Sequence, residues 1–417
     1  MSEEKNSENV VIVPFNGQSG GRLVGQGVLG CIFSPALKCK NTKVRHYPDT
    51  VGKVSKSSET VKEVYVERIF SKNPLSKKYL ILPKADTLCK ELKPIRGQTE
   101  PDIMKCNVIN PASDKAEPYL KLWQYEMDFG GVPLYKKIPT QIAHLPAKFD
   151  FFKFMLQMLE IGTFLALNGF VHNDLHEGNL LVDKAFNTRL IDFNRSFAVQ
   201  QINKTIVESM FAYFEPELGQ IPPEISAIDG INSGYTIWEI TEAIRNKKPS
   251  IRLVEQILGI TKTAQMNEFR NFFSSSPTMR TNNWIKFYKL YWPAIDAWGF
   301  GHILIKVLSK LHSLKTFYDT PEWSSKKFII KPIIRGLLRT SARERIDCVE
   351  ALSMYDPTNK LLLTKAGRAW LEKKDAIRKR QGVMRGGGND FEENDSMSLY
   401  DDGHPSFAQY DELNALF

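Results

Sequence analysis

The polar run from His172 to Asn179 constrains the fold more than any other part of the sequence. It reads HNDLHEGN and follows a long, mainly apolar stretch, Phe151 to Phe170. That stretch carries charged residues that a lipid-facing span would tolerate poorly, so we expect a largely buried helix. Thirteen residues after Asn179 comes Asp192-Phe193, preceded by the run RLI. Residues 169–193 therefore predict short strands and loops within a helical region.

Composition and charge set wide limits on the kind of protein. The chain has 417 residues, of which 42% are hydrophobic and 25% charged, which indicates a globular protein of two or three lobes. The formal net charge is +9, although residues 388–417 hold eight acidic residues and no Lys or Arg. The basic body could hold phosphates, acidic proteins or nucleic acid, and charge alone does not choose among them.

The cysteines and the N-terminus bear on the compartment. The five cysteines are an odd number and include no C-x-x-C pair, which argues against a disulfide framework and a zinc ribbon. This usage predicts a reducing compartment. The polar, acidic first residues do not form a signal peptide. The cysteines are Cys31, Cys39, Cys89, Cys106 and Cys348.

A glycine pattern lies near the start of the chain, at Gly25, Gly27 and Gly30. G-x-G-x-x-G by itself is a weak signal, because it also opens the helix of nucleotide-binding βαβ units. Here the residues after Gly30, including Ile32, continue as a strand and are followed by Pro35. The pattern therefore predicts a strand–turn–strand hairpin.

The run H-x-D-x-x-x-x-N with a following Asp-Phe resembles the catalytic centre of protein kinases. The resemblance implies that Asp174 is the catalytic base and that Asn179 and Asp192 hold magnesium against ATP phosphates. His172 would brace the loop. Each residue alone would also fit a buried histidine or a capping residue, but the joint pattern favours the kinase-like interpretation.

The same resemblance assigns roles near the N-terminus. The glycines would let the backbone close over the ATP phosphates, with Ile32 beside them. The resemblance requires a lysine on the third strand, and Lys53 in the run VGKV is preferred over Lys56. Its partner on the next helix is Glu63 or, one turn later, Glu67, and Glu63 is preferred.

A hinge and a substrate platform are implied further along. Tyr125 would lie behind adenine, and the backbone of Glu126, Met127 and Asp128 would bind the adenine edge, although an ordinary strand end would look the same. Pro222-Pro223-Glu224 resembles the end of a kinase activation segment. Asp296 resembles the residue that starts the central buried helix and holds the catalytic loop. Arg345 resembles the arginine that pairs with the glutamate of the activation segment, here Glu224. A buried Arg–Glu pair can latch such a platform.

Several residues depart from the usual protein-kinase motifs and point to a particular kinase family. Asn173 replaces the Arg that receives an activation-loop phosphate, His176 replaces a Lys, and Asn194 replaces the Gly of Asp-Phe-Gly. A helical insertion lies at about 226–290. The whole combination resembles the serine/threonine kinases of large nucleocytoplasmic DNA viruses.

We therefore expect an α+β, bilobal, protein-kinase-like fold, with a small, mostly antiparallel lobe containing one helix and a larger helical lobe. The expected ranges are an N-terminal extension at 1–20, lobes at 21–125 and 126–370, and a C-terminal segment at 371–417 ending in a flexible acidic tail. The expected cofactors are ATP and Mg²⁺, and the expected substrates are proteins, including virion proteins. We expect no insertion into a membrane and no requirement for nucleic acid. The expected location is the host-cell cytoplasm or the virion. A small-molecule kinase and a pseudokinase that serves as a virion scaffold stay open as alternatives.

Overall fold

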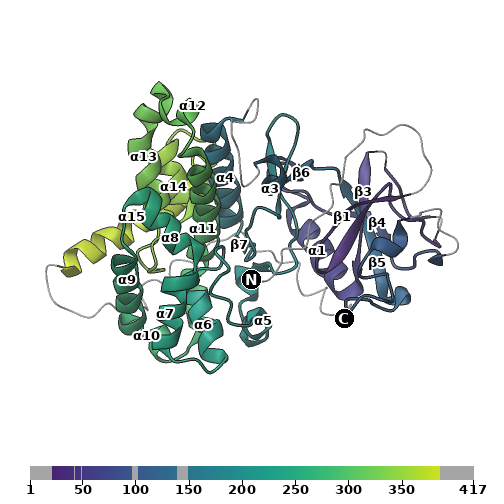
Figure 1. Cartoon of the computed structure of the whole chain (residues 1–417), viewed down its shortest axis with the longest axis horizontal. Coiled ribbons are helices and arrows are strands. Elements are labelled where there is room, and N and C mark those ends of the chain that lie inside the picture. The colour runs from purple at the N-terminus through teal and green to yellow at the C-terminus, as the bar shows by residue number, and fades with distance from the viewer. Residues whose placement is uncertain (1–20, 42, 48, 96–101, 139–148, 386–417) are drawn as a thin grey trace. The chain divides into compact units, whose positions relative to one another are not determined.

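The computed structural model describes residues 21–41, 43–47, 49–95, 102–138 and 149–385, and the fold is mixed α+β (Figure 1). The chain divides into two compact units. Unit 1 comprises the chain up to Gly131 together with Arg189–Asn194, and unit 2 comprises Val132–Thr188 and the chain from Arg195 onward. The expected extension at 1–20 and the acidic tail from 386 lie outside the described residues.

Unit 1 is built on a five-stranded antiparallel sheet of order β1-β2-β3-β5-β4. Gly30 begins β2, and here glycine is required, because a Cβ would lie 2.5 Å from the carbonyl oxygen of Val54 on β3. The predicted hairpin and third strand are thus present in the described residues. The strands are β1 (Arg22–Gln26), β2 (Gly30–Ser34), β3 (Thr50–Lys56), β4 (Lys84–Cys89) and β5 (Leu122–Asp128).

One long helix, α1 (Ser57–Phe70), follows β3 directly and buries Glu63, Val64, Val66 and Phe70. The short helix α2 (Ser76–Tyr79) and the 3₁₀ turns η2 (Ile103–Lys105) and η3 (Tyr119–Lys121) complete the unit. Residues 189–194 join it where the N–H of Ile81 donates to the carbonyl oxygen of Leu190 at 2.9 Å.

The expectation of no disulfides is wrong. Cys31 is bonded to Cys106 and Cys39 to Cys89, with a Cα–Cα distance of 5.9 Å in each pair. All four cysteines belong to one buried cluster with Phe33, Val54 and Leu122. The partners are 75 and 50 residues apart in sequence, so only the folded sheet and the segment after β4 bring their Cα atoms within bonding range. The cysteine count therefore no longer supports a reducing compartment.

Unit 2 is mainly helical. Its small sheet pairs β6 (Val132–Pro133) with β8 (Leu180–Val182), and β7 (Phe170–Val171) pairs with β10 (Phe197–Ala198). The remaining strand, β9 (Thr188–Leu190), leads into residues 189–194. The predicted buried helix is α4 (Phe151–Leu167), whose Asp150 carboxylate accepts the backbone N–H groups of Phe152 and Lys153. The other helices before the insertion are α3 (Leu134–Lys137), the turn η4 (Val199–Gln201) and α5 (Lys204–Met210).

The region of the predicted insertion is helical. It contains α6 (Pro223–Asn232), α7 (Ile237–Lys247), α8 (Pro249–Leu258), α9 (Lys262–Ser275) and α10 (Pro277–Arg280). It leads into α11 (Trp284–Leu311), followed by α12 (Lys315–Tyr318), α13 (Pro321–Leu337), α14 (Cys348–Tyr355) and α15 (Lys365–Arg385).

The central helix begins earlier than expected. The sequence pattern places Asp296 at its start, but α11 begins at Trp284 and continues through Pro293. Proline normally disfavours a helix interior because it lacks an N–H. Here Trp292, Pro293 and most neighbouring side chains are buried, so tertiary packing outweighs this local penalty.

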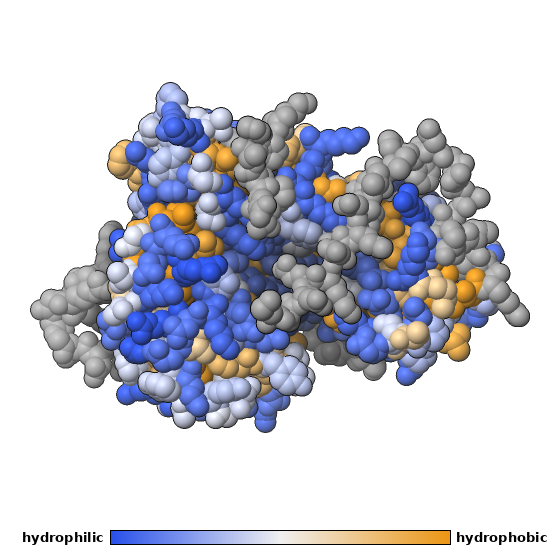
Figure 2. Space-filling view, viewed as in Figure 1, coloured by the Kyte–Doolittle hydropathy of each residue, from blue (hydrophilic) through white to orange (hydrophobic). Residues whose placement is uncertain are grey.

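On the face drawn in Figure 2, hydrophilic residues predominate and apolar residues form separate patches. Among the described residues, no helix is long and apolar enough to cross a membrane. This agrees with the interpretation of Phe151–Phe170 as a buried helix.

Candidate active site

The predicted site residues of unit 1 centre on Lys53. Lys53 lies on β3 and is almost fully buried, and its ammonium forms an ion pair with the buried carboxylate of Glu63 on α1. The same ammonium lies 3.4 Å from Oδ1 of Asp192. Asp192, which is 139 residues from Lys53 in sequence, is thus brought together with Lys53 and Glu63, and the three carry different predicted roles.

The structure also chooses between the alternatives that the sequence left open. The side chain of Lys56 forms an ion pair with Glu117. Glu67 is half-buried and makes no ion pair within the described part of the chain. Lys53 and Glu63 are therefore the pair that faces Asp192.

Burial and neighbouring charges shift the pKa values of Lys53 and Glu63 in this cluster. Burial opposes the charge on Lys53, but the carboxylates of Glu63 and Asp192 outweigh burial and raise its pKa. Burial also raises the pKa of Glu63, and Asp192 adds to that effect, whereas Lys53 opposes it. Two carboxyl groups lie against one ammonium, so the cluster offers the oxygen donors that a hard cation such as Mg²⁺ binds.

Asp192 is held in an unusual backbone conformation. Its φ is +64°, in the left-handed region that side chains other than Gly seldom occupy. Asn194 Nδ2 donates to Asp192 Oδ1 at 2.8 Å. Asn194 is not among the residues with positive φ. The replacement of Gly by Asn at 194 therefore costs no strain there, and the strained position is Asp192 itself.

The three glycines of the hairpin differ in how much space surrounds them. Gly30 is fixed by its contact with β3, but a Cβ on Gly27 would meet nothing nearer than 3.9 Å, and one on Gly25 nothing nearer than 3.5 Å. Ile32 is half-buried on β2, opposite Gly25. Packing among the described residues therefore does not explain Gly25 and Gly27, whereas the close approach of a bound phosphate would.

The predicted hinge residues form the end of β5. Tyr125 is buried and pairs directly with Lys53 in the sheet register. The N–H of Glu126 donates to Thr87 Oγ1 at 2.7 Å, so this donor is not available to an adenine edge. Met127 and Asp128 pair with Val51 and Thr50 on β3.

In unit 2, Asp296 holds the backbone of the predicted catalytic loop. Its two carboxylate oxygens accept the N–H of His172 at 2.7 Å and the N–H of Asn173 at 2.9 Å. His172 is fully buried, and its Nδ1 accepts the N–H of Asp174 at 3.3 Å. Burial raises the pKa of Asp296, although His172 and the two N–H groups oppose that shift.

Within the loop, the side chains of Asp174 and Asn179 lie together. Asn179 Nδ2 donates to the carbonyl oxygen of Asp174 at 2.9 Å and lies 3.5 Å from Asp174 Oδ2. His176 Nε2 is 3.9 Å from the same carboxylate. The Asp174 carboxylate remains partly exposed, so it can accept a proton from a bound hydroxyl group.

The structure brings together the predicted latch residues. Glu224, in the first turn of α6, and Arg345 are both fully buried and form a two-pronged ion pair, with N–O distances of 2.7 and 2.9 Å. Arg345 also donates to the carbonyl oxygens of Ala294 and Arg339 at 2.9 and 2.8 Å. The pair thus connects the residues after Pro222-Pro223 to α11.

Sequence reasoning missed three residues that hold the segment 218–221, directly before Pro222. Lys248 Nζ donates to the carbonyl oxygens of Leu218 and Ile221, each at 3.0 Å. Ser250 Oγ and Trp298 Nε1 both donate to the carbonyl oxygen of Gly219, at 2.7 and 2.9 Å. The sequence gives no signal for this role, because a lysine between two helical patterns normally lies at the surface.

No protein-family model matches the chain, and a search of curated proteins finds no match. Among the described residues, no group of three or more His, Cys, Asp or Glu side chains could hold a metal ion by itself. Mg²⁺ often uses only one or two carboxylates together with substrate phosphates. The two predicted magnesium ligands belong to different units, Asn179 to unit 2 and Asp192 to unit 1.

Proposed function

We propose that the chain is an ATP-dependent serine/threonine protein kinase of the viral type that the sequence resembles. The observation that carries this proposal is the cluster of Lys53, Glu63 and Asp192. Phosphoryl transfer needs a lysine held by a glutamate and an acidic ligand for the metal. In this proposal, units 1 and 2 are the small and large lobes of a bilobal kinase-like fold.

Each side chain then has a role in the transfer. Lys53, positioned by Glu63, binds the phosphates of ATP, and the hairpin at Gly25 and Gly27 covers them. Asp174 accepts the proton of the substrate hydroxyl group, and Asn179 beside it fixes that carboxylate. Mg²⁺, held by Asp192 and Asn179, would neutralise charge on the phosphates.

A protein substrate is favoured over a small molecule by the buried pair of Glu224 and Arg345. The donors from Lys248, Ser250 and Trp298 fix the turn at 218–221, and the pair fixes the start of α6 after it, so this part of the chain offers a well-anchored surface near Glu177 of the predicted catalytic loop. Kinases that act on small molecules generally lack the Pro-Glu segment and its arginine. The two disulfides favour the virion over the reducing cytoplasm as the place where the folded protein persists.

The test is transfer of radiolabelled phosphate from ATP to a casein-like protein and to a metabolite panel. Asp174→Asn should lower transfer to protein by about a hundredfold or more, as expected on loss of a general base. Asp319→Asn, at an exposed aspartate on another part of unit 2, is the matched control and should retain activity. Near-normal transfer by Asp174→Asn would refute the assignment, and transfer to metabolites alone would favour a small-molecule kinase.

A further inference from the structure

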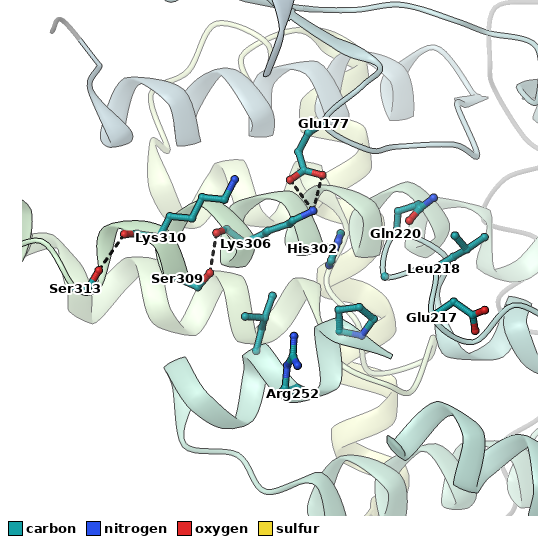
Figure 3. A pocket seen from close by; sticks show the side chains of 13 residues that line it. Glu177, Glu217, Leu218, Gln220, Arg252, His302, Lys306, Ser309, Lys310 and Ser313 are labelled. Atoms are coloured by element: carbon teal, nitrogen blue, oxygen red, sulfur yellow. Dashed lines mark hydrogen bonds and ion pairs between the residues drawn. The ribbon is translucent and has the colours of Figure 1, made fainter. Parts of the chain in front are cut away.

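A pocket of about 960 Å³ opens in unit 2 next to the predicted catalytic loop. Its lining comes from Glu177 of that loop, from residues 217–220, and from α8 and α11. Figure 3 shows Glu177 facing Lys306 of α11, and Arg252 extending from α8 toward α11. The loop, the substrate segment and the insertion thus border one cavity.

The wall of this pocket is rigidly built. The carbonyl groups of residues 218, 219 and 221 accept hydrogen bonds from Lys248, Ser250 and Trp298. Ser250 also contacts Nδ1 of the buried His302 at 2.9 Å. Burial lowers the pKa of His302 to about 3, so this histidine is neutral and adds no charge to the lining.

The charged side chains that line the pocket carry more positive than negative charge. The Glu177 carboxylate is neutralised by Lys306, with Nζ 2.8 Å from Oε1. Among the described residues, Lys310 donates to a neutral group, the carbonyl oxygen of Ile138, at 3.0 Å and makes no ion pair. Arg252 is exposed and makes no ion pair within the part of the chain that the structure describes. Against these two cations stands one exposed carboxylate, Glu217.

We propose that this pocket binds an anionic side chain of the protein substrate, with Arg252 and Lys310 as the groups that recognise it. The inference rests on the proposed kinase function for the identity of the ligand. A carboxylate and a phosphorylated side chain share the required chemistry, because Arg forms two-pronged bonds with both. The insertion, through α8, thus supplies substrate specificity.

Size and position favour a peptide over a small anion. The cavity is far larger than one phosphate, and it adjoins the segment that the proposed function assigns to the substrate. Ser309 of α11 and Ser313, which lies just after the end of that helix, also line the pocket. An extended acidic peptide could therefore place acidic side chains against Arg252 and Lys310 and contact the flanking polar residues.

The experiment uses the full chain and three serine peptides that differ only in the flanking side chain, which is glutamate, phosphoserine or glutamine. Binding is measured by fluorescence anisotropy without ATP, and KM and kcat are measured separately. Arg252→Gln should weaken binding of the two anionic peptides by about three- to fivefold, the effect of losing one exposed ion pair. Its KM for them should rise while kcat is retained. Arg280→Gln, at an exposed arginine on α10 outside the pocket, is the matched control and should change neither value.

Equal binding of the glutamate and glutamine peptides by the wild-type chain would overturn the proposal, as would equal effects of Arg252→Gln and Arg280→Gln. The glutamate and phosphoserine arms identify which anion the pocket prefers. Arg252-dependent binding without any phosphate transfer would uphold the pocket and refute the kinase function. Phosphate transfer at equal rates to the three peptides would uphold the kinase function and refute the pocket's role in recognition.

Discussion

Replacement of Arg345 by methionine tests the buried ion pair that connects the residues after Pro222-Pro223 to α11. Both side chains of the pair are 0% exposed, and Arg345 makes four hydrogen bonds, two to Glu224 and two to the carbonyl oxygens of Ala294 and Arg339. Arg345→Met would leave the Glu224 carboxylate buried without its partner. Such a loss typically costs about 3–5 kcal/mol of unfolding free energy.

The double variant separates the ion pair from simple packing. Replacing both charges by apolar groups of similar volume removes the unpaired charge, so Glu224→Leu with Arg345→Met should cost much less than the two single changes added together. The assay is urea unfolding followed by circular dichroism. As a control, Lys204→Met breaks an exposed pair, with Lys204 Nζ 3.8 Å from Glu208 Oε1, and should cost less than about 0.5 kcal/mol.

Two results would refute this reasoning. A cost below about 1 kcal/mol for Arg345→Met would mean that water reaches the carboxylate, contrary to its burial. Additive single and double costs would mean that the two side chains do not interact energetically.

Three further changes test other parts of the structure. Lys53→Met should lower phosphate transfer by about a hundredfold while Lys56→Met leaves most of it, because only Lys53 faces the two carboxylates; equal losses would contradict this. Burial lowers the pKa of Lys248 to about 7. Between pH 7 and 10, Lys248 is therefore protonated in the unfolded chain but largely neutral in the folded one. The stability of the wild type relative to Lys248→Met should therefore rise with pH in that window, by up to about 1.4 kcal/mol per pH unit, and urea titrations at several pH values would reveal a flat difference if this is wrong. Cys31→Ser should destabilise unit 1 by about 2–4 kcal/mol, measured as a loss of melting temperature that added reductant reproduces in the wild type; an unchanged melting temperature would argue against the bond to Cys106.

Local sequence determined much of the fold. The buried helix at Phe151–Leu167, the third strand around Lys53 and the helices of the insertion all follow from apolar spacing. The polar run from His172 to Asn179 also marked out the residues that surround Asp296, because their spacing within one loop fixes which of them can meet.

The tertiary structure alone decided the remaining points. The choice of Lys53 and Glu63 over Lys56 and Glu67 depends on which side chains face the segment that carries Asp192. Local pattern carries no such information, because residues one turn or one strand step apart have nearly the same spacing signal.

The disulfides and the buried Lys248 are further features that local sequence pattern could not predict. Cys31 and Cys106 are 75 residues apart in sequence, yet their Cα atoms lie 5.9 Å apart in the folded sheet. Lys248 is 1% exposed because two carbonyl groups of a distant segment satisfy its ammonium. Sequence patterns report periodicity within one element, whereas burial and pairing of polar groups depend on partners that only long-range packing supplies.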